Sequence, residues 1–430
     1  LGAAVSPAAD ARDPQPGRMH VQLLRPQDPP ADPSQVSPQT SGGSIPSTEV
    51  MPTGPASAGP RPGTLSVRAG DQRLICDDPA DPYGGATTQI VYTTPGVTVR
   101  KYSKAGRTPL YVTKANLGGG GAEVRPGPLV RHGVSTLETL RDKFAGRGAY
   151  TATNGDFFDW GRTGAPWGPE ITRGATPWSG RSLKQKALVL QQDKTATIAN
   201  VWLSIPIATP KMTVHADSFN SFVLPADGID VFTPLWGTGK RTYIAAKKPV
   251  REYIIQNNVV TAVHTAIGND PVPSNGLIIL AQGDAIGRLS YAGVGQGNPV
   301  AAKAFVHTDA PHGIDSAIGV GMSLVAGGQY QGPVCSKDDA VARTAVGIMD
   351  GGKTMIVAVV QGQTDAAHDD FSGMTAQETT SLMKHLGATD AVMFDGGGSA
   401  NVVTAKTGQL TLSPDGWDRL IPNGYAFWKR

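Results

Sequence analysis

Hydrophobic and polar positions divide the chain into two unequal parts. Before about residue 64 there is no sustained apolar period, and prolines from Pro14 to Pro60 interrupt a background of Ala, Ser, Gly and Asp. Such a segment cannot bury enough apolar surface to offset the entropy lost on ordering. We therefore expect residues 1–63 to form a disordered arm or linker, and residues 64–430 to form the folded domain.

Short apolar stretches alternate with turn signals in the folded part. Many are rich in β-branched residues and are bounded by Gly, Pro or Asn, as strands are. Asp350-Gly351-Gly352 lies between two of these stretches and predicts a tight hairpin turn. The predicted strands cover residues 89–92, 110–113, 187–191, 197–203, 253–255, 277–281 and 354–360.

Two helices interrupt the strands. One is expected to begin at Ser135 and the other at Thr375, and each has a glutamate three positions later, Glu138 and Glu378, as in a capping box. Their apolar faces and glycine terminators are Leu137, Leu140, Phe144 and Gly146 in the first, and Leu382, Met383, Leu386 and Gly387 in the second. These patterns predict an α+β fold, in which a strand-rich mixed sheet is packed with a few helices.

Each predicted helix is followed by a short strand and then by a polar loop that contains glycine. The strands cover residues 149–153 and 391–394, and the loops cover residues 154–158 and 395–399. The similarity is either a weak internal repeat or two common helix–turn–strand units. Ligands gather at strand ends in open sheets, so both loops are candidate site elements.

The second loop reads Asp395-Gly396-Gly397-Gly398-Ser399. Glycines expose backbone amides, and successive amides can bind an anion. No lysine follows, so the loop is not a nucleotide-binding P-loop. A carboxylate beside free amides suits a substrate with an oxyanion or many hydroxyls; the alternative is a tight turn with an aspartate cap.

The first loop, Asn154-Gly155-Asp156-Phe157-Phe158-Asp159-Trp160, combines an amide, two carboxylates and three aromatic rings. Aromatic faces stack on sugars while polar groups take their hydroxyls, so a sugar site fits this loop. Alternatively, a buried aromatic pair anchors it. Glu170 follows soon afterwards and is a reserve acid or base.

Two arginines and several acidic or histidine clusters have more than one interpretation. Arg343 and Arg419 could clamp an anion or form structural ion pairs, and Glu378 could bind substrate or only cap its helix. Metal-ligand spacing is absent from two clusters, which we expect to be solvated loops, although Ca²⁺ on loop carboxylates would be compatible. The clusters are His307, Asp309 and His312, and Asp365, His368, Asp369 and Asp370.

Composition narrows the class of protein. Charged residues make up only 17% and the net charge is +3, without the Lys/Arg blocks that bind nucleic acid. No apolar run approaches the roughly 20 residues of a membrane span. Cys76 and Cys335 form either a long-range disulfide, which would suit an oxidising compartment, or two buried thiols. The small, apolar start resembles the surroundings of a signal-peptide cleavage site.

From about Thr108 to Phe427 the sequence resembles the phosphodiester glycosidase family. The segments that carry the resemblance, in order, are 154–158, 164–174, 230–237, 343–347 and 373–399, with Arg419 and Asn423. Two departures stand out. Asp156 replaces a glycine, and Gln361-Gly362-Gln363 stands where many members have Asp-Gly-Arg, which weakens the expectation of a phosphate-bearing substrate.

The resemblance implies cleavage of a glycosidic bond, with Asp395 as base or nucleophile and Asp156 or Glu170 as its partner. Arg343 and the amides of the loop would hold an anion or hydroxyls. The expected substrate-binding set is Asn154, Gly155, Gly396, Gly397, Ser399, Arg419, Glu378 and Trp160.

Three functions remain open. The first is a secreted bacterial hydrolase that acts on an extracellular or cell-wall glycan, including sugar-phosphodiester linkages. The second is a glycoside hydrolase of an unphosphorylated exopolysaccharide or arabinan-like polymer. The third is a non-catalytic glycan-binding protein. None of these requires a cofactor, a nucleic-acid partner or a membrane span.

Overall fold

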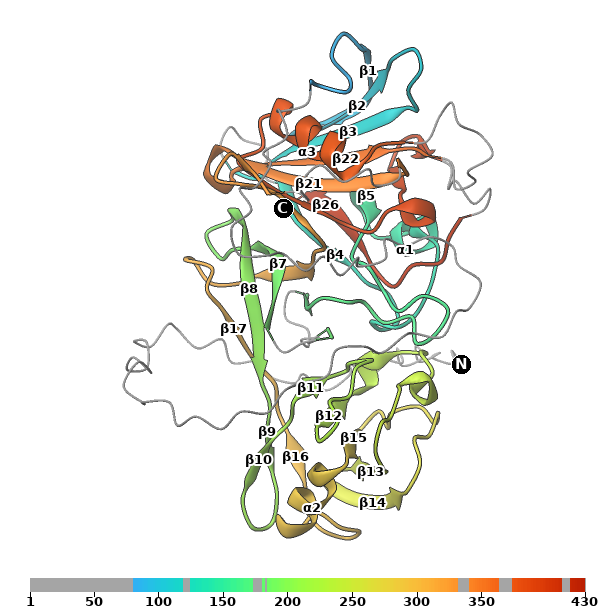
Figure 1. Ribbon diagram of the computed structural model, residues 1–430, viewed down its shortest axis with the longest axis vertical. Coiled ribbons are helices and arrows are strands. Elements are labelled where there is room, and N and C mark those ends of the chain that lie inside the picture. The colour runs from blue at the N-terminus through green and yellow to red at the C-terminus, as the bar shows by residue number, and fades with distance from the viewer. Residues whose placement is uncertain are drawn as a thin grey trace, which may run out of the picture.

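The computed structural model describes residues 80–118, 124–172, 180–181, 184–331, 340–362, 373–411 and 418–429. The predicted arm, Cys76, Cys335, Gln363 and the acidic cluster at residues 365–370 lie outside the described residues. Figure 1 shows the described part as an upper and a lower lobe.

The upper lobe is built around an eight-stranded sheet in which every neighbouring pair is antiparallel. Its order is β1-β2-β3-β22-β21-β23-β19-β20, and β21 and β22 are joined by the turn Asp350–Gly352, which confirms the predicted hairpin. The bounds are β1 Thr87–Thr94, β2 Val97–Ser103, β3 Leu110–Asn116, β19 Ser323–Ala326, β20 Gln329–Tyr330, β21 Arg343–Met349, β22 Thr354–Val360 and β23 Asp390–Met393.

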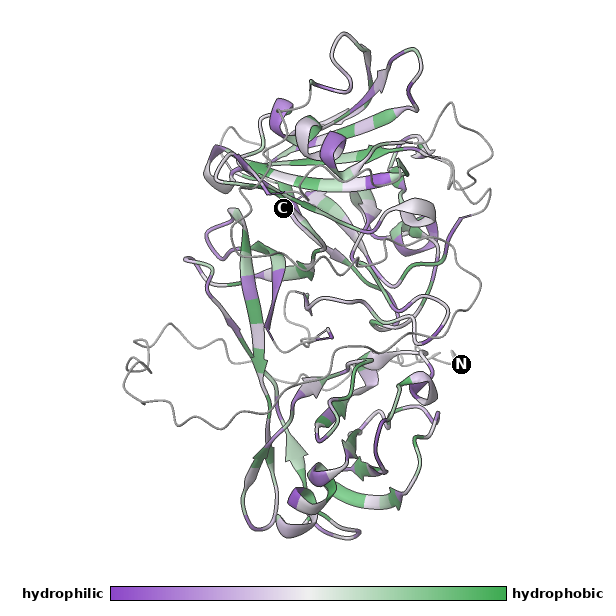
Figure 2. Cartoon of the chain, in the orientation of Figure 1, coloured by the Kyte–Doolittle hydropathy of each residue, from purple (hydrophilic) through white to green (hydrophobic). Residues whose placement is uncertain are grey.

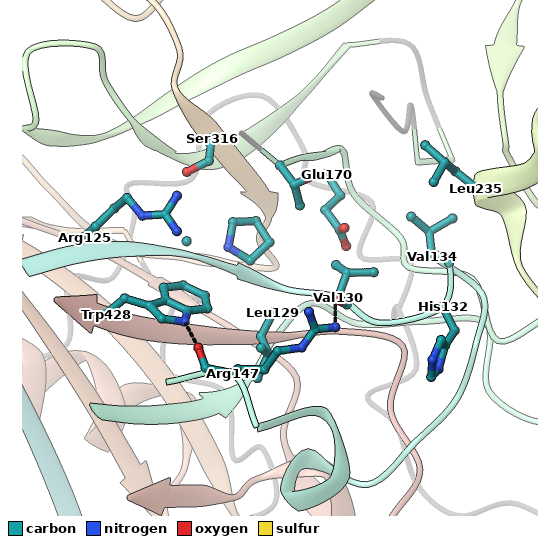
Figure 3. Close-up of a pocket in the computed structure, with 14 residues that line it drawn as sticks. Arg125, Leu129, Val130, His132, Val134, Arg147, Glu170, Leu235, Ser316 and Trp428 are labelled. Atoms are coloured by element: carbon teal, nitrogen blue, oxygen red, sulfur yellow. Dashed lines mark hydrogen bonds between the residues drawn. The ribbon is translucent and has the colours of Figure 1, made fainter. Parts of the chain in front are cut away.

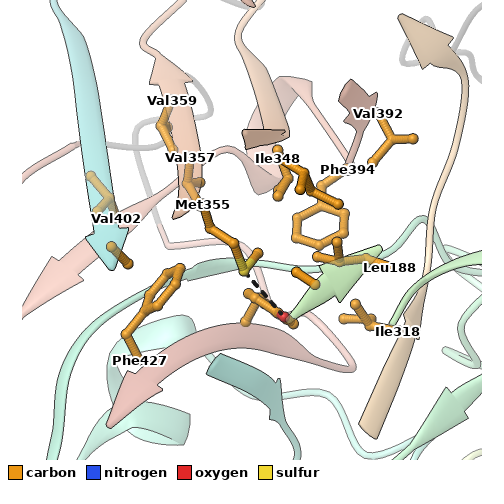
Figure 4. Packing of buried hydrophobic residues seen from close by; sticks show 14 of the residues in the cluster. Leu188, Ile318, Ile348, Met355, Val357, Val359, Val392, Phe394, Val402 and Phe427 are labelled. Carbon is orange, nitrogen blue, oxygen red and sulfur yellow. Dashed lines mark hydrogen bonds between the residues drawn. The ribbon is translucent and has the colours of Figure 1, made fainter. Parts of the chain in front are cut away.

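A five-stranded sheet packs against it, in the order β25-β24-β5-β26-β4. Buried side chains from both sheets form one core, in which Phe394, Val357 and Phe427 lie together (Figure 4). The bounds are β4 Val124–Leu129, β5 Ala149–Asn154, β24 Val402–Thr404, β25 Gly408–Gln409 and β26 Gly424–Lys429. Because β5 and β23 belong to the two packed sheets, the loops that follow them can approach each other.

A third sheet, β17-β8-β7-β18-β6, connects the upper lobe to the lower one. Leu188 and Ile318 extend the upper core into this sheet. The short strand β6 places Glu170 at its edge, paired with Ile318 of β18. The bounds are β6 Glu170–Ile171, β7 Lys184–Leu190, β8 Ala196–Ser204, β17 Phe305–Thr308 and β18 Ser316–Gly319.

The lower lobe, residues 205–304, is inserted between β8 and β17 and has its own core around Val231, Tyr253 and Ile279. Its main sheet is β11-β12-β15-β13-β14, and its smaller one is β10-β9-β16. The bounds are β9 Pro206–Ala208, β10 Thr213–His215, β11 Ser218–Phe219, β12 Ile229–Phe232, β13 Val250–Gln256, β14 Val259–His264, β15 Gly276–Gln282, α2 Asp284–Tyr291 and β16 Ala301–Ala302.

The helices match the predictions only in part. Helix α3, Ala376–His385, has the predicted capping box at Thr375 and Glu378. Helix α1, Leu140–Phe144, begins at the N-cap Thr139, so a start at Ser135 was wrong. The Ser135 hydroxyl instead donates to the Trp236 carbonyl of the lower lobe, which draws that segment away from a helical path. Helix α2 was not predicted.

The strand-rich α+β architecture is as predicted, and hydrophobic residues concentrate on the strands of both lobes (Figure 2). Every strand predicted from the apolar stretches is present, and residues 354–360 form β22 over the predicted range. In the part of the chain described, no helix has the length and apolar character needed to span a membrane.

Candidate functional site

The loops that follow β5 and β23 meet in space. The Asn154 side-chain amide donates to the Asp395 carbonyl at 2.7 Å, although 241 positions separate the two residues. In return, the Asp395 amide donates to the Gly155 carbonyl at 3.0 Å. The two candidate loops therefore form one continuous polar element.

Asn154 holds these loops together. Its side-chain oxygen accepts hydrogen bonds from the Thr344 hydroxyl at 2.8 Å and the Asn401 amide at 3.2 Å. The residue is only 1% exposed. Because its amide group is occupied on both sides, we assign Asn154 to positioning Asp395 rather than to the expected contact with a substrate hydroxyl.

Asp395 is partly exposed at the end of β23, where a substrate could reach it. The Gly396 amide donates to its Oδ1 at 2.9 Å. Burial raises the pKa of Asp395 to about 6, against the lowering effects of the Ser399 hydroxyl, the Gly396 amide and the Arg419 charge. A carboxyl group with this pKa can exchange a proton near neutral pH.

The glycine loop does not provide the expected anion nest from Gly396 and Gly397. The Gly396 amide is bound to Asp395, and the Gly397 amide donates to the Ala342 carbonyl at 2.8 Å. A side chain at Gly396 would lie 2.7 Å from that carbonyl. Gly396 therefore allows the loop to pack tightly against the residue before β21.

Asp156 is a buried carboxyl group, 3% exposed. Its Oδ2 accepts a hydrogen bond from the Gly168 amide at 2.5 Å, and its Oδ1 has no hydrogen-bond partner among the described residues. A side chain at Gly319 would lie 2.2 Å from Oδ2, so this glycine makes room for the carboxyl group. Burial raises the pKa of Asp156 to about 7, with further contributions from the charges of Asp395 and Glu170.

Glu170 is joined to Asp156 through Asn423. Asn423 donates from Nδ2 to Glu170 Oε2 at 2.7 Å and accepts at Oδ1 from the Asp156 amide at 3.0 Å. Burial raises the pKa of Glu170 to about 7, while Asn423 and Lys143 lower it. We call Asp156, Glu170 and Asp395 the carboxylate cluster.

Gly155 and Asn423 fit each other closely. A side chain at Gly155 would lie 2.3 Å from Asn423 Oδ1. The sequence pattern placed Asn423 only in a closing strand and did not reveal this role, because a single buried Asn carries no local signal of its partners.

An aromatic residue and an arginine stand beside the cluster. Trp160 is 50% exposed, and the Arg419 guanidinium lies 5.5 Å from the centre of its ring. Since the Arg419 charge also lowers the pKa of Asp395, this pair lies near that partly exposed carboxylate. A sugar at Asp395 can therefore contact both an indole and a cation.

Trp167 forms a second surface, which sequence reasoning missed. It stacks on Phe157 at 5.5 Å and lies under Arg181, while remaining 37% exposed. Its position directly after Pro166 gave no indication that it would reach the aromatic loop.

Arg343 and Glu378 support the frame of the site. Arg343 is 8% exposed and donates from Nε to the Met374 carbonyl at 3.1 Å, ahead of helix α3. Glu378 closes the capping box with one oxygen and pairs with Arg107 at 2.6 Å through the other.

No group of three His, Cys, Asp or Glu side chains that could hold a metal ion is present among the described residues. His307 contacts Ser204, Asp309 binds Asn200, and His312 lies 3.4 Å from Asp193. These three residues therefore have separate partners. Calcium binding stays a prediction.

A cavity of about 420 Å³ opens beside Glu170, between the lobes (Figure 3). Of the carboxylate cluster, Glu170 alone lines it in the described structure. Its other walls come from β4, β18, β26 and Leu235 of the lower lobe. The cavity therefore lies at one end of the cluster, while Asp395 lies at the other.

The second half of the chain is similar to a known protein family. Residues 250–428 match the phosphodiester glycosidase family. The matched segment contains Arg343, Asp395, Arg419 and Asn423, whereas Asp156 and Glu170 precede it. The predicted family resemblance is thus confirmed. No curated protein matches the chain.

Solved structures share the fold. A hypothetical protein from Synechocystis has 22% identity and a TM-score of 0.63, over 80% of this chain and 64% of that chain. A protein from Burkholderia pseudomallei, named as an exported protein, has 18% identity and a TM-score of 0.58, over 77% and 74%. The zebrafish N-acetylglucosamine-1-phosphodiester alpha-N-acetylglucosaminidase catalytic domain, auto-inhibited by its pro-peptide, has 15% identity and a TM-score of 0.37, over 80% and 88%.

The chain therefore covers 64% of the Synechocystis protein, just under two thirds of its length. At these identities the first two structures support the strand-rich α+β fold and no more.

Proposed function

We propose that the protein is a hydrolase that cleaves a glycosidic bond in an extracellular or cell-wall glycan, including bonds between a sugar and a phosphodiester. One observation carries the proposal. The partly exposed Asp395 lies beside the buried carboxyl group of Asp156 and next to the Trp160–Arg419 pair, so that two titrating carboxyl groups adjoin a surface suited to a sugar.

The two carboxyl groups suit the acid and base roles of glycoside hydrolysis. Burial raises the pKa of Asp156 to about 7 and that of Asp395 to about 6, which makes Asp156 the better candidate for the protonated acid and Asp395 for the ionised base. Asp156 would protonate the leaving oxygen as the bond from the anomeric carbon breaks. Asp395 would attack that carbon or remove a proton from the attacking water.

A phosphodiester substrate relaxes this requirement, because phosphate leaves without prior protonation. Asp395 would then act with Arg419, whose charge lowers the pKa of Asp395. The presence of a second carboxyl group with a raised pKa favours an alternative, hydrolysis of an unphosphorylated exopolysaccharide or arabinan-like polymer. Such a polymer has a poor leaving group and needs an acid.

The family match supports hydrolysis, and the exported Burkholderia protein of the same fold supports a location outside the cytoplasm. A glycan-binding protein without activity is the remaining alternative. The raised pKa of Asp395 argues for catalysis, because a site that only binds sugar hydroxyls has no need of a desolvated carboxylate.

The test is release of sugar. The full chain is incubated with cell-wall polysaccharides, neutral exopolysaccharides and sugar phosphodiesters, and new reducing ends and free phosphate esters are measured. Asp270→Asn, an exposed change in the lower lobe, serves as the matched control for Asp395→Asn. We expect release by the wild type and by the control, and none by Asp395→Asn. Binding of a glycan without release by the wild type would leave the glycan-binding alternative.

A further inference from the structure

The cavity beside Glu170 contains an arginine that no described residue neutralises. Arg125, on β4, lies 5.2 Å from the centre of the Trp428 ring. Its guanidinium makes no hydrogen bond or ion pair with the described residues. Figure 3 shows it directed into the space between Ser316 and Trp428. An arginine that is half-buried without a counter-charge is unfavourable unless a ligand supplies one.

A second arginine stands across the cavity. Arg147 donates one guanidinium hydrogen to the Val130 carbonyl at 3.2 Å, and its own carbonyl accepts from the Trp428 indole at 3.1 Å. The first contact orients the exposed guanidinium, the second holds only the backbone, and further guanidinium donors are left for a ligand. His132 lies at the rim, 3.4 Å from Glu138.

The rest of the cavity offers groups that bind hydroxyls. Glu170 is 3% exposed and Ser316 is 4% exposed, and both line the space. Asn423 holds one Glu170 oxygen. The Ser316 hydroxyl makes no hydrogen bond to a described residue. Two guanidinium groups thus stand around one carboxyl group whose own charge is suppressed by burial.

We propose that this cavity binds a sugar residue that carries an anionic group, a carboxylate or a phosphate ester, with Arg125 and Arg147 holding the anion and Glu170 and Ser316 its hydroxyls. Guanidinium groups suit both anions because they donate two parallel hydrogen bonds. The volume of about 420 Å³ falls in the usual range for small-molecule sites, about 300 to 1,000 Å³.

This site is distinct from the position at Asp395, because Asp395 and Asp156 are not among its lining residues. The bound unit would be one that is not itself cleaved. Anionic glycans would then be held at a second point, beside the carboxylate cluster.

Binding is measured by calorimetry on full-length Asp395→Asn, in which the neighbouring carboxylate is neutral. The probes are galacturonic acid, glucose 6-phosphate and glucose. We expect at least one anionic probe to bind and glucose to give no signal. The anion that binds identifies the group as carboxylate or phosphate.

Arg125→Gln in the same background is expected to weaken anion binding at least tenfold. Arg100→Gln, an exposed change on β2, is the matched control and should leave it unchanged. Gly127→Ala provides a second variant, since its new methyl group would lie 3.5 Å from Ser316 Oγ and 3.7 Å from the Trp428 ring without a clash. It should weaken binding while the melting temperature is kept.

The proposal is overturned if no anionic probe binds, if glucose binds as tightly as the anions, or if Arg125→Gln and Arg100→Gln bind alike. These outcomes do not depend on turnover. A failure of the proposed hydrolysis would therefore leave the anion site standing, and loss of the anion site would leave hydrolysis at Asp395 untouched.

Discussion

Asn423 and Glu170 are joined by a buried hydrogen bond of 2.7 Å, and through the same side chain Asn423 also accepts from the Asp156 amide. One amide group thus ties strand β6 and the loop after β5 to the closing segment before β26. Three segments that lie far apart in the sequence therefore meet at Asn423.

Removing this amide should destabilise the protein. Asn423→Ala leaves the Asp156 amide and the Glu170 carboxyl group without their partner in a buried place, which costs about 1–3 kcal/mol for each unsatisfied group. Urea unfolding checks the loss. Asn269→Ala, at an exposed hydrogen-bonded position in the lower lobe, should cost less than about 1 kcal/mol. Equal losses of stability in the two variants would show that the buried Asn423 hydrogen bonds contribute no more than exposed ones.

Gly155→Ala should displace Asn423, because the new methyl group would lie 2.3 Å from Asn423 Oδ1 and 2.8 Å from Ile318 Cδ1. We expect lower stability together with lower activity. Gly287→Ala is the matched control: it lies in helix α2 with no atom within 4 Å of the new methyl group, so it should stabilise by about 0.5–1 kcal/mol. Thermal unfolding and the rate of sugar release are measured for both variants. If Gly155→Ala is as stable and as active as Gly287→Ala, the close fit of Gly155 and Asn423 is not needed.

Activity should peak between the two raised pKa values. Ionised Asp395 is required, so kcat/KM falls as the pH drops below about 6. Protonated Asp156 is required for poor leaving groups, so kcat/KM falls as the pH rises above about 7. Asp156→Asn should remove most activity on a polysaccharide but little on a nitrophenyl glycoside or a sugar phosphodiester. Equal losses on both kinds of substrate would contradict the acid role.

Stability should also depend on pH. The pKa values of Asp156 and Glu170 are both raised to about 7 in the folded state, so the folded protein binds more protons than the unfolded chain. Their contribution is complete below the unfolded pKa values, near 4, and is lost as the pH rises towards about 7. Urea unfolding should show greater stability at pH 5 than at pH 8. The difference should shrink in Asp156→Asn, and an unchanged difference would count against this assignment.

Trp160 should contribute to binding and not to folding. It is 50% exposed, so Trp160→Ala should leave the melting temperature nearly unchanged while weakening glycan binding by about 1–2 kcal/mol, or roughly tenfold. Tyr291→Ala, at a 75% exposed aromatic residue of the lower lobe, should affect neither quantity. If both variants bind glycan as the wild type does, the Trp160 surface is not used.

The local parts of this fold could be predicted from the sequence. Thr375 and Glu378 formed the expected capping box, and residues 354–360 formed the expected strand, because both signals depend on neighbours within a few positions. Ser135 has the same local pattern but does not begin a helix. Its hydroxyl binds the carbonyl of Trp236 instead, about a hundred positions away.

At the candidate site, the sequence predicted the two loops but not their individual contacts. The sequence placed Asn154 and Asp395 at strand ends, and the structure joins them directly. It could not show that the Gly397 amide would be taken by Ala342, or that Asn423 would bridge Asp156 and Glu170, because such pairings depend on how separate sheets pack.

The central claim is that Asp156 and Asp395 occupy one site and share its electrostatics, and a carboxyl NMR titration of Asp156 tests it most directly. The wild type should show a pKa of about 7 for Asp156, raised in part by the Asp395 charge. In Asp395→Asn that pKa should fall, because the neighbouring charge is gone. A pKa for Asp156 that is the same in both proteins would contradict the account.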